Sequence, residues 1–193
     1  MNTGLVFRVL IVLILLSGPA LADGPFGLRM GMSLDEVGAS PEEVRHGLYK
    51  FTSVPRPHSG FEAYILKFAP STGLCWIKAV GVNIQDNAYG TALRSGFSTL
   101  KEQLSTVYGQ PRDMDFLMPG SIWDEPREYM MALLRKERVL GAIWDLDGER
   151  NLRQVGLIAS ALRRDVGYLS LEYSFTNKDA CDEELQSMES QVF

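Results

Sequence analysis

The sequence lacks the short motifs by which many catalytic and metal sites are recognised. It has no C-x-x-C pair, no H-E-x-x-H pattern, no glycine-rich phosphate loop and no G-x-S-x-G turn. Its only histidines are His46 and His58. His58 adjoins Ser59, but sequence neighbours do not form a triad, which needs a base held by a third group. We therefore expect surface or structural roles for both histidines, and we predict no catalytic, cofactor-binding or metal-binding residue.

One acidic stretch, DLDGE at 145–149, resembles the middle of a calcium loop. The full loop needs a further oxygen ligand two residues before Asp145 and a bidentate glutamate at its end. Those positions hold Ile143 and Gln154. We therefore interpret Asp147-Gly148 as a hairpin turn rather than part of a metal site.

A long apolar run suitable for a membrane span is also missing. Val9–Leu16 is unbroken and apolar, but a spanning helix needs about 20 such residues. Arg8 precedes this run, Ser17-Gly18-Pro19 breaks it, and Ala20-Leu21-Ala22 fits the A-x-A cleavage rule. This pattern predicts a secretory signal peptide at 1–22, cleaved before Asp23, with an uncleaved anchor as the alternative. We expect a periplasmic or secreted protein with no membrane span after cleavage.

Positive charge is scarce. The chain has 19 Lys and Arg against 24 Asp and Glu, and a formal net charge of −5, which becomes one unit more negative without Arg8. Nucleic acids and anionic membranes both require a positive footprint on their partner. The charge balance therefore argues against either as the main partner.

Only two cysteines occur, Cys75 and Cys181. In an exported chain, an even count in an oxidising compartment predicts one disulfide. Such a bridge would attach the C-terminal segment to a strand. The alternative is a buried free Cys75 and an unrelated Cys181, because spacing alone does not show that the two approach each other.

The clearest element is a helix in the stretch Thr91–Pro111. Apolar residues recur at steps of four and three, which places them on one face; they are Leu93, Phe97, Leu100, Leu104 and Val107. Gly109 suits the position that ends a helix, and Pro111 prevents it from restarting. We predict that this helix covers one face of a sheet.

Before this helix, Ser33 with Glu36 forms a capping box, and Met32 can pack on Val37 across the first turn. Ser40, Pro41 and Glu43 then predict a second short helix from Pro41 to about His46. Tyr49–Val54 is a possible edge segment. Phe61–Phe68 and Leu74–Ile84 alternate apolar and polar residues around a turn at 69–73, which predicts a hairpin.

After the helix, Arg112–Gly120 is ambiguous between strand and loop. Tyr129–Lys136 could alternate as a strand, but Asp124, the acids after it and Pro126 favour the start of a helix. From Arg138 to Phe175 the period becomes two, with turn residues near 147–148 and 163–165, which predicts a three-stranded antiparallel meander. Asp179–Met188 is expected to form a short terminal helix.

Two stretches carry a family resemblance: FGLRMGMSLDEV at 26–37, and the helix that ends in YGQP at 108–111. They resemble exported modules of the β-lactamase-inhibitor-protein-like and outer-membrane-assembly small-lipoprotein type. The resemblance implies helices packed on an antiparallel sheet and a role in binding another protein. The chain departs from the lipoproteins because no lipidated cysteine follows its signal, and no inhibitor contact residue can be transferred to it.

The sequence therefore predicts one α+β domain at 23–193, with an antiparallel sheet of about five strands and helices packed on one face. The expected function is that of an exported, non-catalytic envelope protein that binds another envelope protein. The alternatives are an envelope enzyme, which would need His58 or His46 in a cleft beside a carboxylate or hydroxyl, and a carrier of a small apolar ligand or lipid, which would need a closed apolar cavity.

Overall fold

A computed structural model describes residues 24–38 and 41–191; the predicted signal peptide at 1–22 lies outside these ranges. Within them the chain forms one sheet of nine strands, and every strand pair is antiparallel. The strand order is β1-β2-β3-β4-β9-β8-β7-β6, and the short β5 also pairs with β9. The strands are β1 (Glu42–Arg45), β2 (Leu48–Phe51), β3 (Phe61–Ala69), β4 (Gly73–Gly81), β5 (Ile84–Gln85), β6 (Arg112–Leu117), β7 (Arg138–Asp145), β8 (Leu152–Arg163) and β9 (Val166–Phe175).

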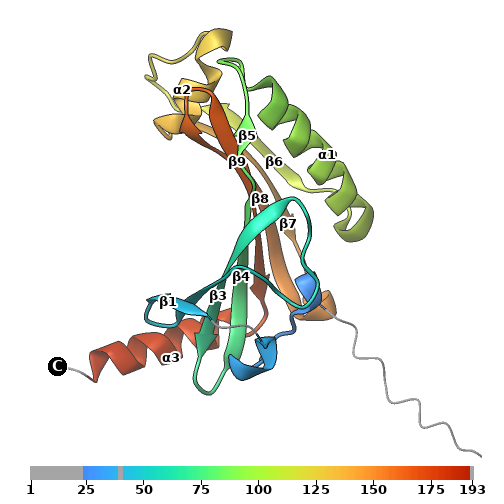
Figure 1. Cartoon of the computed structure of the whole chain (residues 1–193), viewed down its shortest axis with the longest axis vertical. Coiled ribbons are helices and arrows are strands. Elements are labelled where there is room, and N and C mark those ends of the chain that lie inside the picture. The colour runs from blue at the N-terminus through green and yellow to red at the C-terminus, as the bar shows by residue number, and fades with distance from the viewer. Residues whose placement is uncertain (1–23, 39–40, 192–193) are drawn as a thin grey trace, which may run out of the picture.

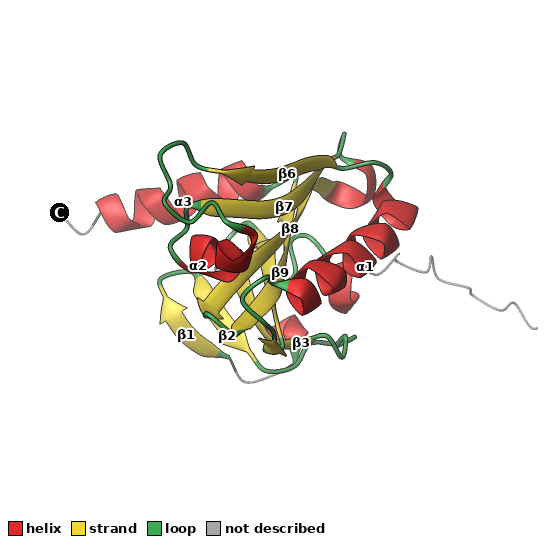
Figure 2. Cartoon of the chain, turned by 90° about the horizontal axis from the view of Figure 1, so that it is seen from above, coloured by secondary structure: helices red, strands yellow, loops and turns green. Residues whose placement is uncertain are grey.

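Three α-helices accompany the sheet in the described ranges: α1 (Thr91–Tyr108), α2 (Tyr129–Leu134) and α3 (Lys178–Ser190). Figures 1 and 2 place α1 and α3 on opposite sides of the sheet. Helix α2 lies beside the start of α1, because its Tyr129 ring contacts the Arg94 guanidinium and α2 shares the main core with α1. Single 3-10 turns occur at Pro25–Gly27, Asp35–Val37, Pro126–Glu128 and Glu149–Asn151.

The predicted architecture was wrong in its sheet size and its layers. Nine strands replace about five, and helices lie on both sides rather than one. The predicted helix at Pro41–His46 is instead strand β1, an exposed edge strand that pairs with β2. Its cap residue Ser40 lies outside the described residues, as does the predicted break at Ala39. The ambiguous Arg112–Gly120 contains β6, the other edge strand.

Other local predictions were confirmed. The hairpin of β3 and β4, the meander of β7, β8 and β9, and the terminal helix α3 all form. Tyr129–Lys136 contains helix α2, and Glu125 with Glu128 builds a capping box before it. The predicted Ser33–Glu36 box forms only in half: Glu36 accepts the Ser33 N–H at 2.7 Å, but the Ser33 hydroxyl donates to the same carboxylate and caps no backbone N–H. Only one 3-10 turn follows.

The strand register gives the sheet two unlike faces. One face is closed over the main core, and its side chains are almost completely buried; examples are Leu66, Ile77, Val155, Leu157, Leu171 and Phe175. The residues between them along each strand point to the other face and are mostly half-buried. We call this second side the open face.

Helix α1 covers the closed face, as predicted. Leu93, Phe97 and Leu104 are buried, and Leu100 is half-buried against the core. Val107, which was predicted to lie in the same stripe, is 50% exposed, and its neighbour Tyr108 packs against the core instead. The Asp86 carboxylate caps the helix start by accepting the N–H groups of Ala92 and Leu93.

The far end of α1 is also fixed. Gly109 ends the helix with a φ of 82°, where a residue without a side chain is favoured. The indole N–H of buried Trp144 on β7 donates to the Gly109 carbonyl at 2.9 Å. This hydrogen bond satisfies the buried indole N–H and holds the end of α1 against the sheet.

Replacing Leu104 by Ala should lower the free energy of unfolding by about 2–5 kcal/mol, because it leaves a cavity under α1. The matched control is Val107→Ala on the same helix, which should change it by about 0.5 kcal/mol or less, since its side chain is already exposed. Urea denaturation of both variants measures the difference. Equal losses for the two would place Leu104 outside the core.

Candidate functional site

The disulfide between Cys75 and Cys181 is present, as predicted. It joins β4 to α3, with a Cα–Cα distance of 6.3 Å and a sequence separation of 106 residues. Both cysteines are fully buried in a small second core, together with Ala69 and Leu185. A disulfide of this kind is compatible with an oxidising compartment.

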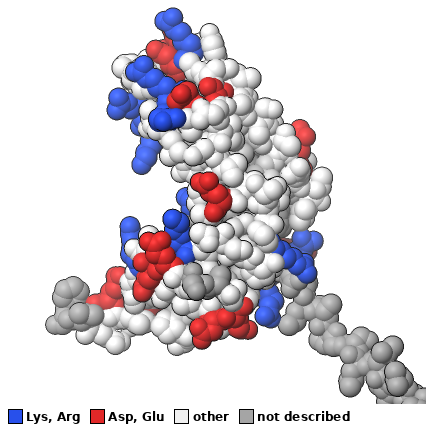
Figure 3. Space-filling model, in the orientation of Figure 1, with Lys and Arg blue, Asp and Glu red and all other residues white. Residues whose placement is uncertain are grey.

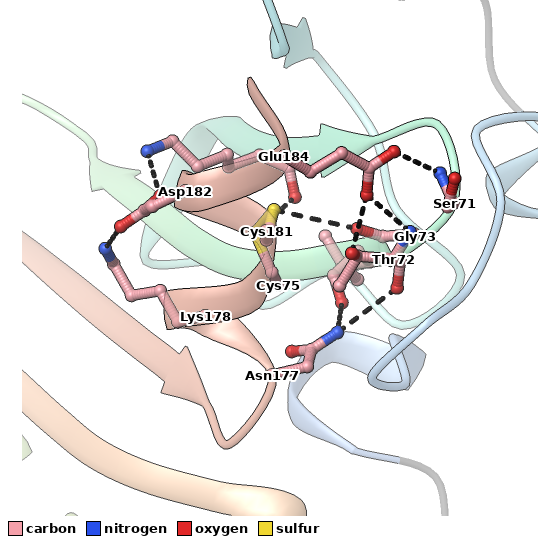
Figure 4. The surroundings of a disulfide bond; sticks show 11 residues. Ser71, Thr72, Gly73, Cys75, Asn177, Lys178, Cys181, Asp182 and Glu184 are labelled. Carbon is pink, nitrogen blue, oxygen red and sulfur yellow. Dashed lines mark hydrogen bonds and ion pairs between the residues drawn. A yellow bond between two sulfur atoms is a disulfide. The ribbon is translucent and has the colours of Figure 1, made fainter. Parts of the chain in front are cut away.

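Hydrogen bonds from the β3–β4 turn hold α3 beside this bridge (Figure 4). The Glu184 carboxylate accepts the Ser71 N–H at 2.7 Å and the Thr72 hydroxyl at 2.6 Å. At the start of the helix, the Asn177 side-chain amide donates to the carbonyls of Thr72 and Leu74. The C-terminal helix is therefore attached covalently and by hydrogen bonds to the same hairpin.

Two lysines reach Asp182 on the same helix. Lys67 Nζ lies 2.6 Å from the Asp182 carboxylate, and Lys178 pairs with it from one turn earlier. Burial alone would raise the pKa of Asp182, but the two ammonium groups outweigh it and lower the pKa. The hydrogen bonds from Thr72 and Ser71 likewise lower the pKa of Glu184.

The open face is the larger candidate binding surface. Pairing across β3, β4, β9, β8, β7 and β6 places on it the apolar, half-buried residues Ile65, Val80, Ile158, Ile143 and Met114. Helix α3 packs at one end of this face through the second core and leaves the rest uncovered. Figure 3 shows that the molecule is hollowed on the side where α3 lies.

An ion pair lies near the middle of the open face. Lys78 Nζ on β4 lies 2.8 Å from the Glu172 carboxylate on β9, and both side chains are about one-third exposed or less. Ser170, on the same face, is buried. The surface thus combines apolar side chains with a central polar contact, a composition common in protein interfaces.

A second candidate is a cleft between α1 and the segment that joins β4 to β5, with a volume of ≈ 310 Å³. We call it the α1 cleft. Its residues come from α1, from the loop before β3 and from the end of β4; they are His58, Gly60, Phe61, Gly81, Val82, Ile84, Ser95, Gly96, Thr99, Leu100, Gln103 and Leu169.

The two histidines are far from equivalent. His46 is exposed at the β1–β2 turn. His58 lines the α1 cleft, and its ring lies 5.5 Å from that of Phe61. Its Nδ1 accepts the Gly60 N–H at 3.0 Å, so no carboxylate orients this nitrogen as in a triad. Hydroxyls of Ser95 and Thr99 line the same cleft, but the cleft has no carboxylate among its lining residues.

In residues 24–38 and 41–191, no group of three or more His, Cys, Asp or Glu side chains could hold a metal ion. The Asp145–Gly148 stretch ends β7 and enters the turn to β8, as the hairpin interpretation predicts. There Asp145 accepts hydrogen bonds from Gln154 and Arg112, which lower its pKa.

Comparisons with known proteins identify no relative. No protein-family model matches the chain, and neither the curated proteins nor the solved structures include a significant match. The resemblance to exported inhibitor-like modules therefore stays a prediction. Among the described helices, none is both long enough and apolar enough to cross a membrane.

Sequence reasoning found the disulfide but missed both surfaces. The open face depends on which strands are neighbours, and alternation within one strand does not reveal this. For the α1 cleft a local signal existed: Gly96 stands in the middle of a predicted helix, where glycine is unfavourable.

Replacing both Cys75 and Cys181 by Ala should lower the free energy of unfolding by up to about 4–5 kcal/mol, since the bridge closes a loop of over a hundred residues in the unfolded chain. Urea denaturation of the oxidised wild type and the double variant measures this loss. Hydrogen exchange in α3 should be faster in the variant. Unchanged stability would mean that the hydrogen bonds alone hold α3.

Glu184→Gln should destabilise the protein at neutral pH but not at acid pH. A carboxyl whose pKa is lowered by folding contributes stability above its unfolded pKa, about 4.3 for Glu, and loses it as the pH falls through the lowered folded value. The difference in unfolding free energy between wild type and variant should therefore shrink below about pH 4. A constant difference from pH 7 to pH 3 would exclude a role for the charge.

Proposed function

We propose that this protein is exported and binds another envelope protein through its open face. The observation that carries this proposal is the contrast between the faces. The closed face has its own covering helix, whereas the open face keeps apolar side chains half-exposed in a concave surface beside α3. An apolar surface of this kind loses contact with water when a partner covers it.

The chemistry of the open face indicates what its partner would present. Ile65, Val80 and Ile158 favour apolar side chains, and the Lys78–Glu172 pair favours a polar group beside them. Burying this ion pair without a new hydrogen bond would be costly. A matching protein surface therefore combines an apolar centre with a donor or acceptor that reaches Lys78 or Glu172.

The compartment in this proposal is periplasmic or extracellular. The signal-like pattern at 1–22 supports it, and so does the disulfide, because bridges of this kind persist in oxidising environments. A binding role also agrees with the implied resemblance to exported protein-binding modules.

The two alternatives have less support. An enzyme built on His58 would need an orienting partner, but its Nδ1 is bound to the Gly60 N–H. A carrier for a complete lipid would need a closed cavity, whereas the α1 cleft is open. The volume of the cleft is also at the lower end of the range for ligand pockets, about 300–1,000 Å³.

The experiment is capture of partners from an envelope fraction with the purified protein as bait, using two matched variants. Ile158→Glu places a charge on the open face. Val107→Glu places the same charge on an exposed site of α1, on the other side of the sheet. We expect one stoichiometric partner that is retained by wild type and Val107→Glu and lost, at least tenfold, by Ile158→Glu.

Circular dichroism and urea denaturation must show that both variants are folded. A partner that binds all three proteins equally would show that the open face is not the contact surface. A partner lost only with Val107→Glu would move the interface to the α1 side.

A further inference from the structure

The α1 cleft has a construction different from the open face. It lies on the α1 side of the sheet, so a protein bound to the open face would leave it uncovered. Its apolar walls come from Phe61, Val82, Ile84, Leu100 and Leu169. Any ligand here would therefore be independent of the protein partner proposed above.

Glycine leaves the space that forms the cleft. Gly96 lies in the middle of α1 and does not have a positive φ, so its backbone does not require glycine. A Cβ at this position would lie 3.7 Å from side-chain carbons of Ile84 and Leu169, which is ordinary contact. Packing therefore does not require glycine either. Gly96 weakens the helix relative to alanine, and its effect is to keep the cleft wide.

Gly81, on the opposite wall of the cleft, is a glycine for a different reason. A Cβ there would lie 2.5 Å from the Leu169 carbonyl oxygen, so the close approach of β4 and β9 requires glycine. Of these two glycines in the cleft wall, only Gly96 is required neither by backbone conformation nor by a close contact.

The lining of the cleft selects for a neutral ligand. No Lys, Arg, Asp or Glu side chain is among its lining residues. Its polar groups are the hydroxyls of Ser95 and Thr99, the amide of Gln103 and the ring of His58. Burying an ionised group against these walls without a counter-charge would be costly.

His58 supplies one directional hydrogen bond. Because its Nδ1 accepts the Gly60 N–H, the neutral ring carries its proton on Nε2. The backbone N–H of His58 donates to the Tyr64 hydroxyl at 3.1 Å, which helps to fix the loop. The ring thus leaves one N–H available to a ligand at the rim of an apolar space.

We infer that the α1 cleft binds a small, neutral, mainly apolar molecule that carries one hydrogen-bond acceptor, such as an aromatic or branched ketone or ester. The acceptor pairs with His58 Nε2–H, and the apolar body lies over Gly96 between Ile84 and Leu169. The volume of ≈ 310 Å³ admits a two-ring compound and excludes a lipid with a full acyl chain.

The probe for this proposal is the neutral fluorescent ketone 6-propionyl-2-dimethylaminonaphthalene, whose emission shifts to the blue in an apolar site. We expect saturable binding of one molecule per chain. The anionic probe 8-anilinonaphthalene-1-sulfonate should bind at least tenfold more weakly, because the cleft offers no cation.

Variants of α1 locate the site. Gly96→Leu and Thr99→Phe should each weaken binding of the ketone at least tenfold by filling the cleft, and Thr99 is exposed, so its replacement leaves the core intact. The matched control Glu102→Leu, on an exposed position of the same helix outside the cleft, should bind normally. Gly96→Ala should raise the melting temperature by about 2–4 °C through helix propensity.

No saturable blue shift in the wild type would overturn the proposal, as would unchanged binding in Gly96→Leu and Thr99→Phe. Loss of the captured envelope partner in these two variants would assign the cleft to a protein side chain instead and also overturn it. Failure of the open-face experiment would leave the ketone titration unaffected, since Ile158 and Gly96 lie on opposite sides of the sheet.

Discussion

The pairing of β4 with β9 holds the two halves of the molecule together. On one side of it lie β1, β2 and β3, and on the other lie β8, β7 and β6. Within each half, every strand is antiparallel to its neighbour. The disulfide repeats this connection covalently, because Cys75 is on β4 and Cys181 is on the helix that follows β9. Both the continuous core and the continuous open face depend on this single pair of strands.

The two faces follow from the alternation of side chains along these strands. Residues on the α1 side meet a helix and each other, so they are large, apolar and buried. Their neighbours meet a helix, α3, only at one end of the sheet, and elsewhere they stay half-exposed. The attachment of α3 at one end thus decides how much of this face is left uncovered.

The sequence predicted elements well where one face is buried. Leu93, Phe97 and Leu104 have the helical period, and β9 alternates, because each packs against the core. Edge strands β1 and β6 lack this signal, since solvent reaches both of their sides. Around Glu43 the residues typical of a helix start therefore predicted a helix. Pairing with β2 makes this segment a strand instead. The disulfide could be predicted from the expected compartment and the number of cysteines alone. The open face and the α1 cleft could not be predicted, because they depend on contacts between distant segments.

The order of the strands also affects how the chain folds. Strands β1 to β4 pair with sequence neighbours and can form early, but the partners of β4 on β9 lie about a hundred residues further on, and such distant contacts form slowly. Until residues 166–175 are available, β4 is an unpaired apolar edge of the kind that joins with other chains. A chain interrupted before β9 would therefore expose an aggregation-prone sheet, and protection of this edge until β9 pairs with it is a requirement built into the topology.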